Sequence, residues 1–291
     1  MIKQPVFEQA QIVIENCITN GAGMFDIWRE TANVRFGDVD LSGRVTLGSI
    51  FSFFQEAAIS HAADLGVGLR ALEVKGQAWM LSRISIFVER RPAYGETIQV
   101  STWPRQWEKL FALRDYEIKD ENEKAVVRAR SCWLIIDLEK RRPLRVQPVV
   151  DPLPPNHGID AFPAGAAALN SRETFKKTGE RIAHYSDIDY IGHANNARYI
   201  QWIQDATDAG LLTKADQTRL DINYLSEVKP GETVELWTDC IANQTTDGNG
   251  GEYYSAAYNP ADYPKKAGAA FAYEGRRPEN GQAVFRAELR V

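Results

Sequence analysis

The chain has 291 residues, of which 44% are hydrophobic and 25% charged, with a formal net charge of -5. This composition is typical of a folded globular protein, and the acidic balance argues against a general nucleic-acid binder, which is usually basic. No stretch approaches the roughly 20 apolar residues of a membrane span, and the N-terminus lacks the long apolar segment of a secretion signal, so we expect a cytoplasmic protein.

In chain order, the first half begins with a strand that ends in a polar turn containing Gly43. A helix follows, with apolar residues at three- and four-residue spacing between Ile50 and Ala58. Four runs of alternating residues then predict antiparallel strands at 80–89, 96–103, 112–120 and 125–138.

A proline-rich segment divides the chain near its midpoint. Six of the 13 prolines fall between Pro143 and Pro163, and the segment that follows is poor in β-branched and aromatic residues. This composition predicts an irregular linker over residues 151–178. The second half then repeats the order of the first, with a polar turn, a helix containing Tyr199 and Ile203, and five predicted strands at 219–228, 232–239, 251–259, 267–275 and 283–291.

The two halves also match residue by residue. A shift of 149 positions places residues 36–57 on 185–206 without a gap, and a shift of 136 places 94–103 on 230–239. These matches indicate a duplicated domain. Features that both copies share are expected to be structural, namely Asp38 with Asp187 and Gly43 with Gly192 in the turn. Asn195 and Asn196, next to the turn of the second half, are expected to cap the following helix.

The copies differ at two positions where chemistry could reside. His193 in the second half corresponds to Arg44, and Glu227 corresponds to Arg91. Because a guanidinium stays protonated whereas imidazole and carboxylate exchange protons, only the second half has the groups for acid/base catalysis. Two other histidines are expected to be structural, His61 and His157. The three cysteines show no paired spacing and are expected to be reduced and buried: Cys17, Cys132 and Cys240.

Three stretches of this sequence resemble the acyl-ACP thioesterase family of bacteria and plants. They are residues 79–118, with the TWP and LRD sequences, residues 131–144, with RRP, and the turn and helix at 186–206. The resemblance implies an α+β fold, a tandem or double hot-dog in which each half wraps a long antiparallel sheet around a central helix. We expect an N-terminal extension at 1–24, an acyl-chain-binding domain at 25–150, and a catalytic domain at 179–291.

The resemblance also implies the catalytic positions. Carried over one at a time, they are Asp189, Ile191, His193 and Glu227. Isoleucine departs from the family's asparagine and cannot polarise a carbonyl. We expect an activated water to hydrolyse the thioester, with Glu227 or His193 as general base; attack by Asp189 to give a mixed anhydride is the competing route. Two backbone N–H groups are expected to stabilise the oxyanion, those of Gly192 and Ala194. Val228 replaces a cysteine of the family, which excludes a thiol nucleophile here.

The implied substrate is a fatty acyl chain on the phosphopantetheine arm of acyl carrier protein, with acyl-CoA as a possible second substrate. Large side chains are expected to set the depth of the acyl pocket: Phe53, Phe54 and Trp79. An acidic carrier would favour basic residues, and we expect it to contact Arg141, Arg142, Arg145 and Arg198, beside Lys140. No metal, nucleotide or other cofactor motif is present. An acyl-binding protein without turnover remains the alternative, because of Ile191, and the sequence leaves monomer and homodimer open.

Overall fold

The structure, a computed structural model, describes residues 26–291 except 152, 155, 157, 163–165, 216 and 242–268. The first half contains β1 (Trp28–Asn33), α1 (Leu47–Asp64), α2 (Leu69–Glu73), β2 (Gln77–Val88), β3 (Thr97–Glu108), β4 (Phe111–Lys119), β5 (Ala125–Asp137), β6 (Arg142–Leu144) and α3 (Gln147–Val150). The second half contains β7 (Lys176–Ile182), α4 (Asn196–Asp205), α5 (Ala209–Lys214), β8 (Thr218–Tyr224), β9 (Thr233–Ile241), β10 (Ala270–Arg276) and β11 (Ala283–Arg290).

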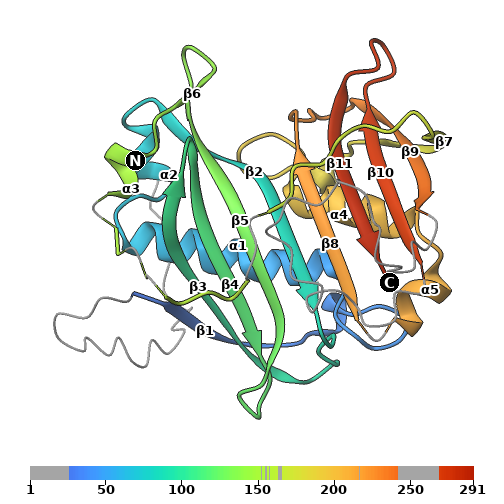
Figure 1. Cartoon of the computed structure of the whole chain (residues 1–291), viewed down its shortest axis with the longest axis horizontal. Coiled ribbons are helices and arrows are strands. Elements are labelled where there is room, and N and C mark those ends of the chain that lie inside the picture. Colours follow the sequence, from blue (N-terminus) through green and yellow to red (C-terminus); the bar gives the residue numbers. More distant parts are fainter. Residues whose placement is uncertain are drawn as a thin grey trace, which may run out of the picture.

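The strands form one continuous antiparallel sheet. Their order is β1-β3-β4-β5-β2-β8-β11-β10-β9-β7, with β6 beside β5. Read inward from either edge, the order is the same in both halves, because β7, β9, β10, β11 and β8 take the places of β1, β3, β4, β5 and β2. Figure 1 shows this broad curved sheet in front of α1 and α4. The duplication and the tandem hot-dog arrangement are confirmed.

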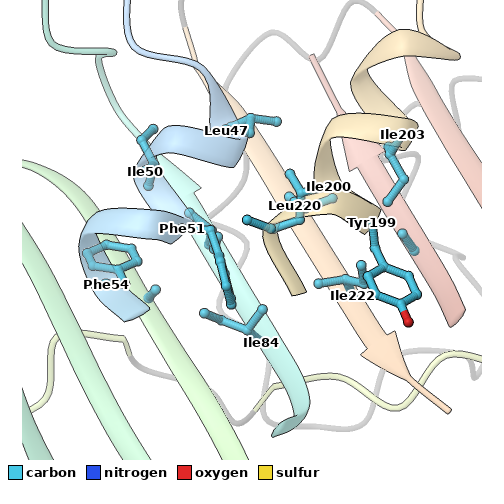
Figure 2. Packing of buried hydrophobic residues seen from close by; sticks show 14 of the residues in the cluster. Leu47, Ile50, Phe51, Phe54, Ile84, Tyr199, Ile200, Ile203, Leu220 and Ile222 are labelled. Carbon is cyan, nitrogen blue, oxygen red and sulfur yellow. The ribbon is translucent and has the colours of Figure 1, made fainter. Parts of the chain in front are cut away.

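The two long helices cover the concave face of the sheet and supply most of its core. Figure 2 shows Phe51 of α1 pointing toward Ile84 of β2, Phe54 on the side of α1 away from Ile84, and Ile200 of α4 lying over Leu220 of β8. Phe54 is buried and packs against Tyr116, with 4.9 Å between ring centroids. Burial of one such side chain stabilises the fold by roughly 1.5–3 kcal/mol, so this inner face dominates the stability of the sheet.

The halves join where β2 pairs with β8. Ser85 pairs with Asp221, and these two positions are also equivalent in the repeat, so the pseudo-twofold axis passes through this pair. The Ser85 hydroxyl donates to Asp221. Behind the sheet, α1 approaches α4 closely: the Gly48 N–H donates to the side-chain oxygen of Gln204 at 3.0 Å. A single core therefore runs through both halves.

The segment between the halves lies against the outer face of the sheet. Asp160 accepts hydrogen bonds from Arg130, and the Ala161 N–H donates to the buried Asp115 at 2.9 Å. Further along, the Leu169 N–H donates to Asn223. The linker predicted over 151–178 is thus irregular but packed, because it covers charged groups of the strands, and β7 already begins at Lys176.

The structure also tests the predictions for single cysteines, histidines and helix caps where it describes those residues. The strand predicted at 251–259, Cys17 and His157 lie outside the described residues. Cys132 is buried as expected, whereas Cys240 is exposed on β9. Only Asn195 caps α4, by accepting the Ala197 N–H at 2.9 Å, because Asn196 is already the first helical residue. Within the described part of the chain, no helix has the length and apolar character to cross a membrane.

Candidate active site

The turn between β7 and α4 is held by hydrogen bonds that recur in the first half. The carboxylate of Asp187 accepts the His184 N–H at 2.8 Å, and its backbone carbonyl accepts the Asn195 N–H at 2.8 Å. In the first half, Asp38 accepts the Arg35 N–H at 2.8 Å in the same way. The structural role predicted for both aspartates is confirmed.

Asp189 is fixed by the same turn. Its Oδ1 accepts the backbone N–H of Ile191 at 2.9 Å, as Oδ1 of Asp40 accepts that of Ser42 at 2.8 Å. Gly192 completes the turn with φ at 91°, a left-handed conformation that a β-carbon would strain. Because residue 191 holds Asp189 through its backbone, the turn does not depend on the side chain there. The Ile191 side chain is exposed.

His193 and Glu227 come together beside this turn. Nε2 of His193 lies 3.2 Å from Oε2 of Glu227, with 27% and 45% of the two side chains exposed. His193 belongs to the turn, and Glu227 lies in the loop after β8, because that strand ends at Tyr224 rather than at 228. A partly exposed imidazole within 3.2 Å of a carboxylate has the groups to accept and return a proton.

In the first half, the equivalent residues Arg91 and Arg44 are held by hydrogen bonds to neighbouring groups. Arg91 is 5% exposed, its Nη1 lies 2.5 Å from Oδ2 of Asp40, and its Nη2 donates to the Leu212 carbonyl of α5 at 3.0 Å. Arg44 donates to the backbone carbonyl of Arg91. This arrangement ties the first-half turn to the second half of the chain and leaves no group there that exchanges protons near neutral pH.

The loop that carries Glu227 is fixed by Arg277, from the hairpin between β10 and β11. Nη2 of Arg277 donates to the Glu227 carbonyl at 2.7 Å, and Nη1 donates to Glu232 at 2.8 Å. Glu232 also accepts the Lys229 N–H at 2.9 Å. Partial burial raises the pKa of Glu232, but the hydrogen bonds from Lys229 and Arg277 outweigh it and hold the pKa below its usual value.

Glu96 is the first-half equivalent of Glu232, and it takes its hydrogen bonds from a different arginine. Glu96 accepts from Arg90 of its own loop, and Arg90 also bonds Asp120 of the hairpin between β4 and β5. The arginine that binds this glutamate therefore belongs to the loop in the first copy and to the hairpin in the second. Arg277 was not predicted from the sequence; the difference between Asp120 and Arg277 in the two corresponding hairpins is the signal that could have identified it.

Tyr199 connects α4 to the same loop. Its hydroxyl is hydrogen-bonded to the backbone of Val228, and its ring packs edge-on against Phe285 at 5.6 Å between centroids. Burial raises the pKa of Tyr199, so the side chain stays neutral. The helix that follows His193 and the loop that carries Glu227 are thus joined by one buried side chain, which the sequence analysis assigned only to the core.

The two backbone donors predicted for an oxyanion are already occupied. The Gly192 N–H donates to the Asp189 carbonyl at 3.0 Å, and the Ala194 N–H donates to the Val228 carbonyl at 2.8 Å. The expectation of free N–H groups at these residues is therefore wrong, because the turn uses both for its own closure. The Asn196 N–H, at the first residue of α4, has no acceptor among the residues that the structure describes.

Arg141 is the one residue of the predicted carrier-binding set that contacts the pair. Its Nη2 lies 3.6 Å from Oε2 of Glu227, although it belongs to the hairpin between β5 and β6 in the other half. In Figure 1 this hairpin projects at the same edge as the hairpin between β10 and β11. Arg142 and Arg145 are exposed nearby in sequence. Arg198 instead donates to Gln201 within its own helix.

The side chains predicted to set the acyl pocket lie in packed surroundings. Phe54 is buried against Tyr116, Phe53 is half-buried, and the Trp79 indole donates to the Val67 carbonyl at 2.8 Å. A groove of about 700 Å³ opens beside the turn, and its lining includes Asp189 but neither His193 nor Glu227; the other lining residues are Ala183, His184, Tyr185, Ser186, Ile188, Pro230 and Gly231. Asp189 is therefore the predicted catalytic residue that this groove exposes.

The double hot-dog sheet brings an imidazole and a carboxylate into contact in its second half. The chain belongs to the acyl-ACP thioesterase family: the N-terminal domain of that family matches residues 26–152, and its C-terminal domain matches residues 171–262. Both halves of the fold are thus covered by the match, including the turn at 185–195 and Glu227.

Individual relatives are distant. A chloroplastic acyl-[acyl-carrier-protein] hydrolase of Cuphea viscosissima is 23% identical, over 95% of this chain and 71% of its own. A chloroplastic palmitoyl-acyl carrier protein thioesterase of Arabidopsis thaliana is 24% identical, over 69% of this chain and 52% of its own. The chain therefore spans about half to seven tenths of the length of these two relatives.

Two solved structures share the fold over nearly the whole chain. An acyl-ACP thioesterase from Bacteroides thetaiotaomicron superposes with a TM-score of 0.73 at 24% identity, covering 91% of this chain and 97% of its own. A 12:0-ACP thioesterase from Umbellularia californica gives a TM-score of 0.67 at 17% identity, covering 92% and 96%.

Proposed function

We propose that this protein hydrolyses the thioester of a fatty acyl chain carried on acyl carrier protein, releasing a free fatty acid and the carrier thiol. The observation that supports it is the 3.2 Å contact between His193 Nε2 and Glu227 Oε2, present in the second half and replaced by two arginines in the first. Membership of the thioesterase family supplies the reaction class.

The contact suggests how the two residues divide the work. A neutral imidazole has one donor and one acceptor nitrogen, so a His193 that donates from Nε2 to Glu227 presents Nδ1 as its acceptor. Nδ1 then takes a proton from the attacking water, and Glu227 fixes the tautomer and stabilises the imidazolium that forms. The proton returns to the departing thiolate sulfur.

Asp189 fits a polarising role better than a nucleophilic one. One of its oxygens accepts the Ile191 N–H at 2.9 Å, which holds the carboxylate in the turn and withdraws charge from it. On the water route, no acyl group becomes attached to the protein. Mass spectrometry of the intact enzyme after acid quench during turnover distinguishes the routes, because an adduct of the mass of the acyl group, absent in Asp189→Asn, would establish the anhydride.

The carrier would approach the exposed basic hairpin that contains Arg141 and Arg142. The carrier is acidic, and these side chains lie on the half opposite to the catalytic pair but reach it through Arg141. Charge complementarity of this kind raises the association rate more than the affinity, so raising salt is expected to increase KM for acyl-ACP.

The deciding experiment follows free thiol release from acyl-ACP and acyl-CoA. We expect His193→Ala and Glu227→Gln each to lower kcat by about 10²–10⁴, the usual contribution of a general base, while the equivalent first-half variant Arg44→Ala keeps wild-type kcat. Full activity in both second-half variants would refute the assignment.

The alternative function, acyl binding without turnover, is favoured by one residue. Ile191 stands where the family pattern has asparagine, and its exposed side chain offers no hydrogen bond to a thioester carbonyl. Tight acyl-ACP binding without hydrolysis, together with turnover that appears only in Ile191→Asn, would establish that function in place of the first.

A further inference from the structure

Two side chains share one carboxylate oxygen at the candidate site. Oε2 of Glu227 lies 3.2 Å from His193 Nε2 and 3.6 Å from Arg141 Nη2. His193 approaches from the turn of the second half, whereas Arg141 approaches from the first half. The catalytic carboxylate therefore contacts two cationic or proton-donating groups, of which only His193 has a place in the proposed reaction.

The backbone of the hairpin delivers Arg141 to this position. Asp137, the last residue of β5, accepts the N–H groups of Glu139 and Lys140 at 3.1 and 2.9 Å, which orders the turn. Arg141 itself has φ at 51°, the left-handed region that non-glycine residues rarely occupy. The hairpin thus holds an arginine in an unfavourable backbone conformation at its tip, directed at the site of the other half.

The contact between Arg141 and Glu227 is one in which another anion can replace the carboxylate as the partner of Arg141. The Arg141 side chain is 75% exposed and that of Glu227 is 45% exposed, so solvent screens the pair and a stronger anion can displace the carboxylate. A phosphate ester is such an anion, because a guanidinium binds two of its oxygens at once through parallel N–H groups. Exposed Lys140 and Arg142 on either side add to the positive potential.

We infer that Arg141 recognises the phosphate at the end of the substrate's pantetheine arm and leaves Glu227 when it does so. This inference rests on the proposed function. The free enzyme then keeps its carboxylate partly neutralised by Arg141, and a phosphate-bearing substrate removes that cation as it binds. Glu227 is left with His193 alone, so recognition of the arm and completion of the acid/base pair are one event. The phosphate can come from acyl carrier protein or from CoA.

The test compares acyl-phosphopantetheine with acyl-pantetheine of the same acyl chain. In the wild type we expect kcat/KM to be about tenfold higher with the phosphate. Arg141→Ala is expected to abolish this ratio, by lowering kcat/KM for acyl-phosphopantetheine more than for acyl-pantetheine. Arg141→Lys should restore part of the ratio. The control Lys124→Ala removes one exposed charge at the opposite end of β5 and should keep the full ratio.

Acyl-CoA and acyl-ACP, measured with the same variants, separate the two sources of phosphate. A loss in Arg141→Ala that is confined to KM for both substrates supports recognition of the shared phosphate. An unchanged phosphate ratio in Arg141→Ala would overturn the inference, as would an equal loss of rate on acyl-pantetheine, which would show that Arg141 only supports the fold of the site.

A binding measurement decides the inference even if no thioester is hydrolysed and the proposed function fails. Titration calorimetry with phosphopantetheine and with pantetheine, neither carrying an acyl group, should show about tenfold tighter binding of the phosphorylated arm by wild type and by Lys124→Ala, and no difference in Arg141→Ala. Equal binding of the two arms by the wild type would refute the inference independently of catalysis.

Discussion

Arg91 and Glu227 occupy equivalent positions of the repeat, yet Arg91 lies 2.5 Å from Asp40 of its own turn, whereas Glu227 lies 3.2 Å from His193. In the first half, the residue at this position closes the turn through a buried ion pair with Asp40. In the second half, the corresponding aspartate, Asp189, lies open beside a groove. The two copies therefore differ at this position in the ionisable groups that they leave accessible to solvent.

The Arg91 ion pair is expected to stabilise both halves at once, because the same guanidinium also donates to the Leu212 carbonyl. Arg91→Met should lower the free energy of unfolding by about 3 kcal/mol, since it leaves Asp40 partly buried without its cation. Urea denaturation measures the loss. Arg44→Ala, an exposed neighbour, should cost less than about 0.5 kcal/mol. Equal effects of the two variants would contradict the assignment.

Arg277 is expected to act on catalysis through the backbone of Glu227. Arg277→Ala removes the 2.7 Å bond to the Glu227 carbonyl and frees the loop, so kcat should fall about tenfold with little change in KM. The first half provides the control: Arg90→Ala breaks the equivalent contact to Glu96 and should reduce stability without lowering kcat per folded molecule. Steady-state kinetics on folded protein compares the two, and a similar fall in kcat for Arg90→Ala would argue against the local effect.

Gly275 on β10 marks a close approach that a side chain cannot share. A β-carbon there would lie 2.3 Å from the ring of Phe285, which is fully buried against Tyr199 of α4. We expect Gly275→Ala to destabilise the protein by about 1–3 kcal/mol through overpacking, as measured by chemical denaturation. Gly37 has open space around its α-carbon, so Gly37→Ala should be nearly neutral. A neutral Gly275→Ala would show that the ring can move aside.

His61 on α1 is expected to make stability depend on pH. The side chain is fully buried, and burial together with Arg114, whose Nη1 lies 3.1 Å from its Nδ1, lowers its pKa to about 3. The unfolded chain, with a pKa near 6.5, therefore binds more protons between these values, so the stability present above pH 6.5 falls as the pH drops toward 3. The expected loss due to His61 between pH 7.5 and 5.5 is about 1.4 kcal/mol.

Urea denaturation at the two pH values checks this for wild type and His61→Gln. The variant should lose about 1.4 kcal/mol less than the wild type between pH 7.5 and 5.5, because glutamine has no proton to gain. His184→Gln, at an exposed position, should retain the wild-type dependence. A pH dependence that is the same in all three proteins would show that other groups cause it.

Most strands of the fold, and the correspondence between its two halves, could be predicted from the sequence. The alternation of apolar residues predicted β2 through β5 and β8 through β11, with most ends within three residues of those observed. The exceptions are β3, which extends to Glu108 rather than 103, and β8, which ends at Tyr224 rather than 228; the strand expected at 251–259 lies outside the described residues. The repeat predicted which strands correspond. Periodicity suffices for this because strand and helix faces are local properties of the chain. The same comparison of copies singled out His193 and Glu227, since a proton-exchanging group opposite an arginine is visible without any geometry.

The sequence by itself therefore determined the duplicated architecture, and it predicted which half holds the chemistry and which pair of residues carries it. Only the tertiary structure decided that Arg141 crosses from the other half to Glu227, that Arg277 holds the Glu227 loop, and that Gly192 and Ala194 have no free N–H. These contacts join residues about 50 to 90 positions apart, or depend on how one turn closes on itself. Their partners are chosen by the order and curvature of the assembled sheet, which no local pattern in the chain encodes.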